Sequence, residues 1–582
     1  MYLKRTPSKS GRVSLSAVQA YRDESGKKRQ RTVETFGFVD ELEREFEDPV
    51  AHFRAVVAEM DAARLAEEAP ATIEIHPRQR VDKRESGQLR RHAGDTLACW
   101  WLDALGVEAA IRNGMRGRRC GYDLNAALRL LVCERLLEPG SKLAAWERRD
   151  RHFFRTELTD DDVYRALDEL DRLSDRIVGA CNRSIARNSG RDESLVYYDV
   201  TNYFFECDPD ADGLRRKGVS KEHRPNPIVQ MGLLQDSEGI PIAYDLFAGN
   251  TNDCETLLPV LKRRRERGLG RVVVVADKGM NCSDNMAGIV AGGDGFVFSQ
   301  SIRGTRSTSE LRGWALDDAG YAASPDGEFK VKSRQDSKTV HLKEVDTFDG
   351  KAKDVNVEVK VVAMWSRKYA ERARHERERV LEKSRQLVAN PGAYTRATHY
   401  GAAQFVKGVT FDRRTGEVLE EAGTKPQIDE DAVARAAELD GYYLIITSET
   451  DWEDSRILDA YRELWRIEES FRVTKTGGLD SRPVWVWTPE HVRAHFLTCY
   501  LALLIVRLSQ RALPSHPSAE ALLADMRSLD CSYADDGWWL FDHRTDLTDE
   551  IFSLVGEEAP RKWMRTKDIK ALFRKGKDIR WR

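Results

Sequence analysis

Long apolar runs are missing from this 582-residue sequence. A helix that crosses a bilayer needs about 20 apolar residues, and the longest run here, residues 496–506, is flanked by His495 and Arg507. We therefore expect residues 496–506 to form a buried helix and the protein to have no membrane partner. The first residues are not followed by an apolar stretch, so we also expect no secretory signal peptide.

Paired cysteines are missing too. The nine cysteines are scattered, and the nearest pair, Cys120 and Cys133, lies 13 positions apart. Zinc sites and disulfide frameworks depend on cysteines at short, regular spacings. We therefore expect reduced thiols in a cytosolic protein, with neither a zinc site nor a disulfide framework.

Charge of one sign does not dominate, since the sequence has 93 Lys and Arg residues and 96 Asp and Glu residues. The cations gather at the ends: residues 1–35 carry nine basic and three acidic side chains, and residues 561–582 carry ten and two. Basic ends fit contact with DNA phosphates as well as they fit two solvated tails. With 41% hydrophobic residues the chain can build real cores, which excludes global disorder.

The middle of the chain has an ordered series of strand and helix patterns. We expect three strands, a helix, a fourth strand and, after a long interval, a further strand and helix, at residues 194–205, 228–234, 240–248, 255–268, 271–277, 442–447 and 454–475. Three antiparallel strands followed by a parallel crossover are the order of an RNase H-like sheet. We therefore predict a multidomain α/β protein with an RNase H-like (retroviral-integrase-like) catalytic core.

Three acidic residues occupy set points of that order. Asp199 lies in the first strand, Asp277 ends the fourth strand, and Glu468 lies on the last helix. Converging carboxylates repel one another, and divalent cations are their usual compensation. Taken singly, Asp199 also fits a solvated strand-edge acid and Asp277 a turn cap, but their joint order favours a site for phosphoryl transfer.

The helix expected at residues 454–475 carries a polar stripe. Tyr461, Glu468 and Lys475 are seven residues apart, so they share one side of a continuous helix. A hydroxyl, a carboxylate and an ammonium group suit contacts with phosphate, metal and phosphate respectively, whereas the alternative is a solvated polar face. We assign Trp465, Ile467 and Phe471 to the packing side of this helix.

Residues 461–475 resemble the Y-REK signature of bacterial insertion-sequence DDE transposases, a branch that cuts its element ends through DNA hairpins. Residues 198–201 and 276–280 resemble the first and second Asp motifs of the same family. The resemblance extends from about residue 195 to 500, with weaker agreement at both ends.

The resemblance implies a role for each candidate residue. Asp199, Asp277 and Glu468 would bind two Mg²⁺ (or Mn²⁺) ions per active site. Tyr461 and Lys475 would hold phosphates of the DNA at the element end.

One position departs from the signature. Its arginine is replaced by Leu464, and Arg472, one turn beyond Glu468, is the expected substitute. The departure leaves the hairpin step open. Glu469 is the rival for the third acid, although it lies about 100° around the helix from the Tyr461–Lys475 stripe.

The interval between Asp277 and Glu468 is too long for a bare connection, so we expect an inserted domain. Family members use a tryptophan of this insert to hold a flipped base. Trp365 and Trp314 are the candidates here, with a core position as the alternative for either. We interpret Trp485 and Trp487 as packing residues rather than as base-stacking residues.

The expected division has five parts: a basic β-hairpin at 1–38, a mostly helical DNA-binding and assembly region at 39–190, the catalytic core at 191–280 and 441–478, an insertion domain at 281–440, and a helical C-terminal region with a basic tail at 479–582.

These observations predict a transposase of the bacterial cytosol or nucleoid. It would bind the terminal inverted repeats of its insertion sequence, cleave the element ends and join the 3′-OH ends to target DNA by two-metal phosphoryl transfer. Synapsis of two ends would need a homodimer. An RNase H-like DNA nuclease without strand transfer and a non-catalytic end-binding repressor are the alternatives.

Overall fold

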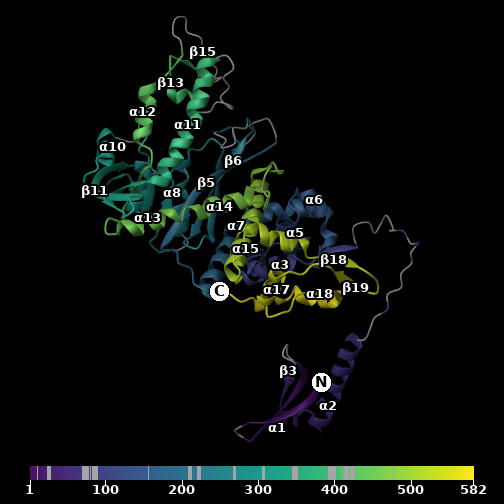
Figure 1. Cartoon of the computed structure of the whole chain (residues 1–582). Coiled ribbons are helices and arrows are strands. Elements are labelled where there is room, and N and C mark those ends of the chain that lie inside the picture. Colours follow the sequence, from purple (N-terminus) through teal and green to yellow (C-terminus); the bar gives the residue numbers. More distant parts are fainter. Residues whose placement is uncertain are drawn as a thin grey trace. The chain divides into compact units, whose positions relative to one another are not determined.

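The computed structural model (Figure 1) describes residues 1–8, 11–22, 28–68, 72, 78, 80, 89–154, 156–206, 213–218, 225–266, 270–303, 308–343, 351–390, 401–408, 410–411, 418–419, 426–475 and 477–581. The chain forms two compact units, residues 1–80 and 81–582. The boundary between the two units falls inside the predicted part 39–190, and the five predicted parts stay predictions.

The N-terminal unit is a three-stranded antiparallel sheet with a helix. Its elements are β1 (Tyr2–Pro7), β2 (Val13–Arg22), β3 (Lys28–Phe38), α1 (Val39–Leu42) and α2 (Pro49–Glu68). The predicted hairpin is confirmed as β2 and β3, and β1 adds a third strand on β2. The rings of Phe36 and Phe53 stack with centroids 4.4 Å apart, so α2 packs on the sheet.

The larger unit is built on a nine-stranded sheet with the order β10-β11-β12-β17-β9-β8-β5-β6-β7 (Figure 1). The strands are β5 (Leu195–Phe204), β6 (Ile228–Asp236), β7 (Pro241–Ala248), β8 (Val273–Ala276), β9 (Gly295–Gln300), β10 (Ala322–Ala323), β11 (Phe329–Leu342), β12 (Lys353–Ser366) and β17 (Tyr442–Thr447).

Four of these strands have the predicted order. β5, β6 and β7 are antiparallel neighbours, and β8 follows on the other side of β5 as a parallel strand. β9, which the sequence did not predict, continues the parallel arrangement beside β8. Helix α8 (Leu257–Glu266) joins β7 to β8, and α9 (Ser283–Ala291) joins β8 to β9. All four residues of β8 are buried, as expected for a strand covered on both faces. This part of the sheet is consistent with an RNase H-like core.

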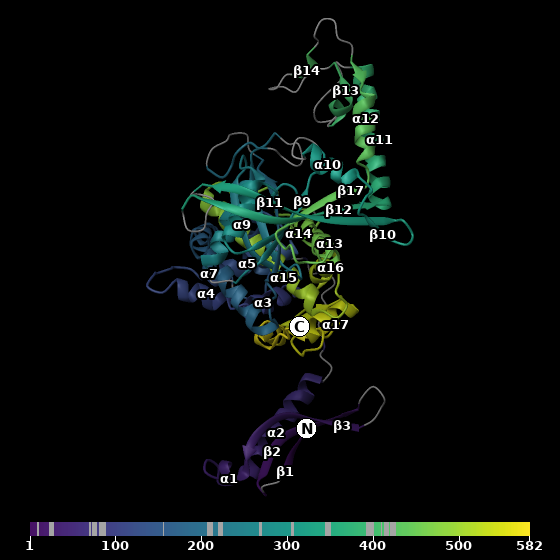
Figure 2. The ribbon, with the colours of Figure 1, turned by 90° about the vertical axis from the view of Figure 1, so that its left-hand side faces the viewer.

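Strands from the predicted insertion segment extend the same sheet. β17 pairs antiparallel with β9 on one side and with β12 on the other, and β12 pairs with β11. Figure 2 shows α11 leading away from β12, with α12 and β13 beside it. The remaining elements are α10 (Ser309–Leu316), α11 (Arg367–Ala389), α12 (Glu430–Glu438), β13 (Val406–Lys407), β14 (Thr410–Phe411), β15 (Val418–Leu419) and β16 (Gln427–Ile428).

The helix predicted at residues 454–475 is interrupted, which corrects the continuous-helix interpretation. α13 (Asp454–Arg462) and α14 (Trp465–Lys475) are separated by Glu463 and Leu464. The amide of Leu464 donates to the carbonyl of Tyr461 at 3.1 Å, a tight three-residue turn rather than an α-helical bond. Leu464 is buried by this turn.

A helical layer packs against the sheet. Its centre is α15 (Pro489–Ala512), which lies beside α5 and α7 (Figure 1). In the described part of the chain α15 alone is long and apolar enough to cross a membrane, and 89% of its most apolar window is buried inside the protein. The predicted buried helix at 496–506 is therefore confirmed. The other helices here are α3 (Asp95–Ala104), α4 (Val107–Gly114), α5 (Leu124–Leu137), α6 (Lys142–Glu147) and α7 (Asp160–Ser189).

The C-terminal region contains strands that the sequence did not predict. β18 (Asp530–Tyr533), β19 (Trp538–Phe541) and β20 (Trp563–Arg565) form a sheet whose fourth strand is β4 (Arg90–His92). The C-terminal region and the N-terminal helices thus share a sheet and a hydrophobic core. Its helices are α16 (Ala519–Ser528), α17 (Asp546–Ser553) and α18 (Thr566–Leu572).

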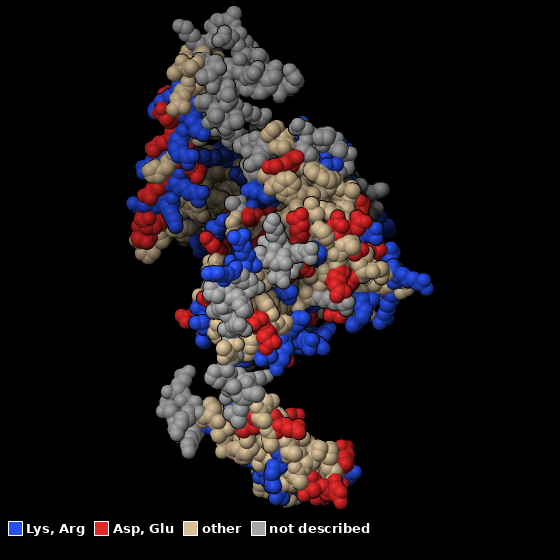
Figure 3. Space-filling view, turned by 90° about the vertical axis from the view of Figure 1, so that its right-hand side faces the viewer, with Lys and Arg blue, Asp and Glu red and all other residues tan. Residues whose placement is uncertain are grey.

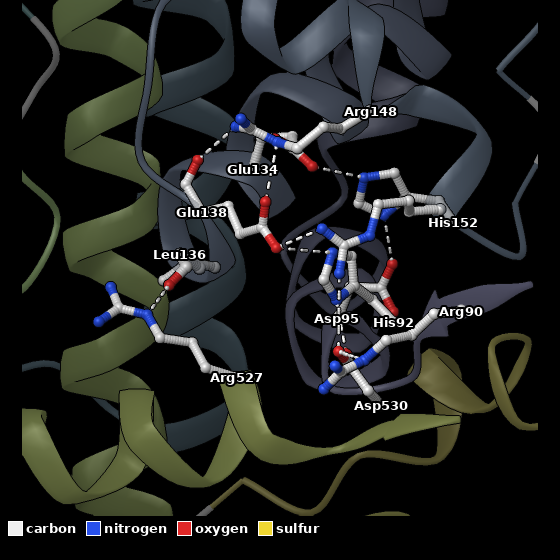
Figure 4. A network of polar contacts seen from close by, with 11 residues as sticks. Arg90, His92, Asp95, Glu134, Leu136, Glu138, Arg148, His152, Arg527 and Asp530 are labelled. Atoms are coloured by element: carbon white, nitrogen blue, oxygen red, sulfur yellow. Dashed lines mark hydrogen bonds and ion pairs between the residues drawn. The ribbon is translucent and has the colours of Figure 1, made fainter. Parts of the chain in front are cut away.

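A buried polar network lies where these two regions meet (Figure 4). His152 Nδ1 lies 2.7 Å from Asp95 Oδ2, and its Nε2 lies 3.0 Å from Glu134 Oε1. Beside it, His92 Nδ1 lies 2.7 Å from Asp530 Oδ1, which links β4 to β18. Burial alone would lower the pKa of His152, but hydrogen bonds and charges from Asp95 and Glu134 outweigh it and raise the pKa to about 9.

The raised pKa of His152 predicts a pH-dependent contribution to stability. The folded pKa of about 9 lies above the ordinary 6.5, so the contribution is complete below about pH 6.5 and is lost as the pH rises through about 9. We expect the stability difference between wild type and His152→Gln, measured by urea unfolding, to shrink by a few kcal/mol across this window.

Lys142 supplies the control for that pH dependence. Its buried amine is hydrogen-bonded to His495 Nδ1 at 3.2 Å, and burial lowers the pKa of Lys142 to about 7. The unfolded state then binds more protons between about pH 7 and 10.5, so this contribution rises with pH. The stability difference between wild type and Lys142→Met should therefore grow as the pH rises. A stability difference between wild type and His152→Gln that does not change with pH would contradict the role of His152.

Candidate active site

A cavity of about 400 Å³ opens between the sheet and α14. It is lined by Asp199, Thr201, Asp277, Leu464, Glu468, Phe471, Arg472 and Lys475. Five of the six predicted site residues are thus together, and the sixth, Tyr461, lies against Tyr443 with ring centroids 5.5 Å apart.

Strand β5 directs Asp199 toward α14. Side chains of a strand alternate between faces, so Tyr197, Asp199, Thr201 and Tyr203 share one face. The hydroxyl of Tyr197 donates to the carbonyl of Ala460 at 3.2 Å, and that of Tyr203 lies 2.7 Å from Thr474 Oγ1. These bonds show that α13 and α14 cover the face that carries Asp199.

Parallel pairing brings Asp277 next to Asp199. Tyr198 of β5 is the register partner of Ala276, the last residue of β8. The residue that follows each of them is an aspartate, Asp199 after Tyr198 and Asp277 after Ala276. Neighbouring strands are about 4.8 Å apart. The amide of Gly279 donates to Asp277 Oδ1 at 2.7 Å, and a Cβ at Gly279 would lie 2.9 Å from the same oxygen. Glycine therefore allows this close approach.

Helix α14 supplies Glu468 in its first turn. Burial raises the pKa of the Tyr461 phenol, and the charges of Asp277 and Glu468 add to the rise. Tyr461 thus lies within electrostatic reach of both acids, although the break at 463–464 removes it from the continuous stripe.

Two cations stand at the cavity. The side chain of Arg472 is 77% exposed, and Lys475 Nζ lies 5.7 Å from the ring centroid of Tyr203. Leu464 lines the wall beside them.

The rival acid points elsewhere. Glu469 does not line the cavity. Its Oε2 accepts from Arg507 Nη1 at 3.3 Å, and its Oε1 lies 4.0 Å from Arg472 Nη2. Glu468 is therefore the acid of α14 that faces the two aspartates.

Sequence reasoning missed Thr201, which lines the cavity and was signalled by its spacing two residues beyond Asp199. Of the three residues assigned to the packing side, Ile467 and Phe471 are buried as predicted, and Phe471 also lines the cavity. The assignment is wrong for Trp465, which is 51% exposed. Trp465 is the first residue of α14, after the turn at 463–464. The direction of its side chain therefore cannot be extrapolated from the residues of α13.

The donor chemistry fits a hard divalent cation, because Asp199, Asp277 and Glu468 offer carboxylate oxygens alone. Within the described residues, however, no three or more His, Cys, Asp or Glu side chains stand close enough together to hold an ion. The three acids share the cavity without forming a ligand shell, so their side chains would have to close around a metal.

The wider surface carries no large single-sign region on the face shown in Figure 3, where Lys and Arg alternate with Asp and Glu.

Two family models match parts of this sequence. Residues 210–505, more than half of the chain, match the family described as Transposase DDE domain. The chain belongs to this transposase family. Residues 3–71 match the IS1634 family transposase, N-terminal domain. A search of curated proteins finds no match.

The transposase match has consequences for the site. Asp277 and Glu468 lie inside the matched region, whereas Asp199 precedes it. A DDE domain implies an RNase H-like core and a metal-dependent enzyme that acts on DNA, and both matches support an insertion-sequence transposase.

Proposed function

We propose that this transposase binds the terminal inverted repeats of its own insertion sequence, cleaves the element ends and joins the 3′-OH ends to target DNA. The observation that carries the proposal is the single cavity shared by Asp199, Asp277 and Glu468 in a DDE-family chain. Both steps are in-line attacks of an oxygen on phosphorus, so one site serves for both.

Each residue has a separate task in this proposal. Asp199, Asp277 and Glu468 would hold two Mg²⁺ (or Mn²⁺) ions, which supply Lewis-acid activation of the attacking and leaving oxygens when bound. Lys475 and Arg472 bind phosphates of the element end and orient the scissile bond. Tyr461, whose pKa is raised by burial, donates a hydrogen bond toward the acids or a phosphate.

The Y-REK branch is part of the proposal. Tyr461, Glu468 and Lys475 provide three members of the signature, and Arg472 reaches the cavity from the turn beyond Glu468. Since Leu464 is buried in the wall, Arg472 takes over the phosphate contact of the missing arginine.

Assembly follows from the chemistry. Joining two ends of one element to one target requires two active sites, so a homodimer forms in the synaptic complex. We assign the element-end contacts to the parts predicted at residues 1–38 and 39–190 and to the basic tail of 479–582, and the catalytic core to 191–280 with 441–478.

One assay distinguishes the proposed function from its alternatives. Full-length protein is incubated with a labelled element end and target DNA in Mg²⁺, Mn²⁺ or EDTA. Joined product supports the transposase, cleavage without joining indicates a nuclease, and a mobility shift without cleavage indicates a repressor. EDTA should abolish both reactions and leave binding measurable.

Arg472→Ala is expected to weaken binding to element ends several-fold. Loss of one phosphate contact should also reduce the salt dependence of binding by about one unit of log–log slope. Fluorescence anisotropy across a salt series measures both quantities. Arg462→Ala is the matched control, because Arg462 lies on α13 and pairs with Asp459 at 2.9 Å. If the affinities of wild type and Arg472→Ala had equal salt-dependence slopes, the phosphate contact of Arg472 would be contradicted.

A further inference from the structure

Two exposed tryptophans lie just beyond the active-site helix. In the segment between α14 and α15, Val484 and Val486 are buried, whereas Trp485 and Trp487 are 47% and 46% exposed. The alternation means that the valines anchor the segment and both indoles face outward. The packing predicted for these tryptophans is therefore only partial, because about half of each side chain is exposed.

This segment is fixed close to the catalytic cavity. The amide of Val484 donates to the carbonyl of Phe204, the last residue of β5, at 3.2 Å. Phe204 is three residues beyond Thr201, which lines the cavity, and three strand residues span about 10 Å. The hydrogen bond therefore fixes the backbone at Val484, next to Trp485, about 10 Å along β5 from Thr201.

Basic groups accompany the indoles. The guanidinium of Arg215 lies 5.8 Å from the ring centroid of Trp487, but this side chain is buried and packs on the indole. Arg216 and Lys217 follow it on the exposed surface. These two exposed cations, with Lys475 at the cavity, are the groups that can contact a phosphate backbone.

We propose that Trp485 and Trp487 form a stacking platform for the unpaired bases of a DNA strand that leaves the catalytic cavity. Aromatic rings beside a basic track are the usual means of holding single-stranded nucleic acid without sequence preference. Paired bases inside a duplex cannot stack on a protein ring, so the platform acts where the strands have separated near the cut. The proposal rests on the function proposed above and adds the form of DNA that the site takes.

Binding of three DNA probes to the full chain in EDTA tests the platform. The probes are a blunt duplex, the same duplex with a single-stranded poly-dT tail, and poly-dT alone, each fluorescein-labelled for anisotropy. Wild type should prefer the tailed duplex to the blunt one. Trp485→Ala/Trp487→Ala should reduce binding of the tailed duplex by about tenfold per stacked base and leave blunt binding unchanged.

Two further variants separate stacking from folding. Trp485→Phe/Trp487→Phe should retain most of the preference for the tail, since phenylalanine keeps a ring. Trp563→Ala should behave as wild type, because Trp563 is a similarly exposed tryptophan on β20 in the C-terminal sheet. A photo-crosslink from 4-thiothymidine in the tail should map to residues 485–487.

The outcomes separate this proposal from the proposed function. No preference for the tail in wild type, or an unchanged preference in the double alanine variant, overturns the platform. A change in oligomeric state of that variant by light scattering, with tail binding intact, would assign the indoles to a protein interface instead. Binding of no DNA in any form would overturn the proposed function itself.

Discussion

Replacing Glu468 by glutamine is expected to slow cleavage of the element end by on the order of 10³-fold, about 4 kcal/mol in activation free energy, while end binding persists. Glutamine preserves the size of the side chain but removes its charge and one of its two oxygen acceptors. The three acids share one cavity, so loss of one carboxylate weakens metal binding by the whole set. A gel assay of labelled end cleavage measures the rate, and anisotropy in EDTA measures binding.

The adjacent acid provides the matched control. Glu469→Gln has the same chemistry one residue along the helix, but Glu469 pairs with Arg507 and does not line the cavity. It should cleave at nearly the wild-type rate, with any loss confined to stability. If Glu469→Gln were inactive and Glu468→Gln active, the third acid would be Glu469 and the orientation of α14 in solution would differ.

The residues that line this cavity were largely predictable because their signals are local. The valine-rich run at 271–277 ends in an acid, which marks a buried strand and the point where its chain leaves the sheet. The structure places β8 there, directly beside β5. Strand order then brings Asp199 and Asp277 together without any further information.

The break between α13 and α14 was not predictable by the same means. The residues at 462–465 include neither glycine nor proline, so no local signal marks an end of the helix. The turn is stabilised by tertiary burial of Leu464, which competes successfully with helix propensity. Seven-residue spacing alone therefore placed Tyr461 on a stripe that the folded chain does not form.

The C-terminal strands escaped prediction for a related reason. β18 pairs with β4, more than 400 residues earlier in the chain, as in the register Asp530–His92. β18 and β19 have four residues each, and β20 and β4 have three, too short to show a clear period of two. Their position depends on the contact between the N-terminal helices and the C-terminal region, where the buried polar network lies.

Asp95→Ala is expected to destabilise the larger unit by about 3–5 kcal/mol, the usual effect of removing one partner from a buried ion pair. Asp95 is fully buried at the start of α3 and contacts His152 Nδ1 at 2.7 Å. Its loss leaves an imidazolium in the core with Glu134 as its remaining carboxylate partner. The network joins α3 and α5 to the sheet formed by β4 and β18, so both regions should unfold together at lower urea concentration.

Asp161→Ala is the control for this loss of stability. Asp161 also pairs with a cation, Arg165 at 3.2 Å, but both side chains are mostly exposed. An exposed pair contributes less than about 1 kcal/mol, because water and salt screen the charges. Urea unfolding followed by tryptophan fluorescence compares the two variants with wild type. Equal midpoints for Asp95→Ala and Asp161→Ala would show that the buried network adds no more than a surface pair, and that hydrophobic packing around α15 alone holds the two regions together.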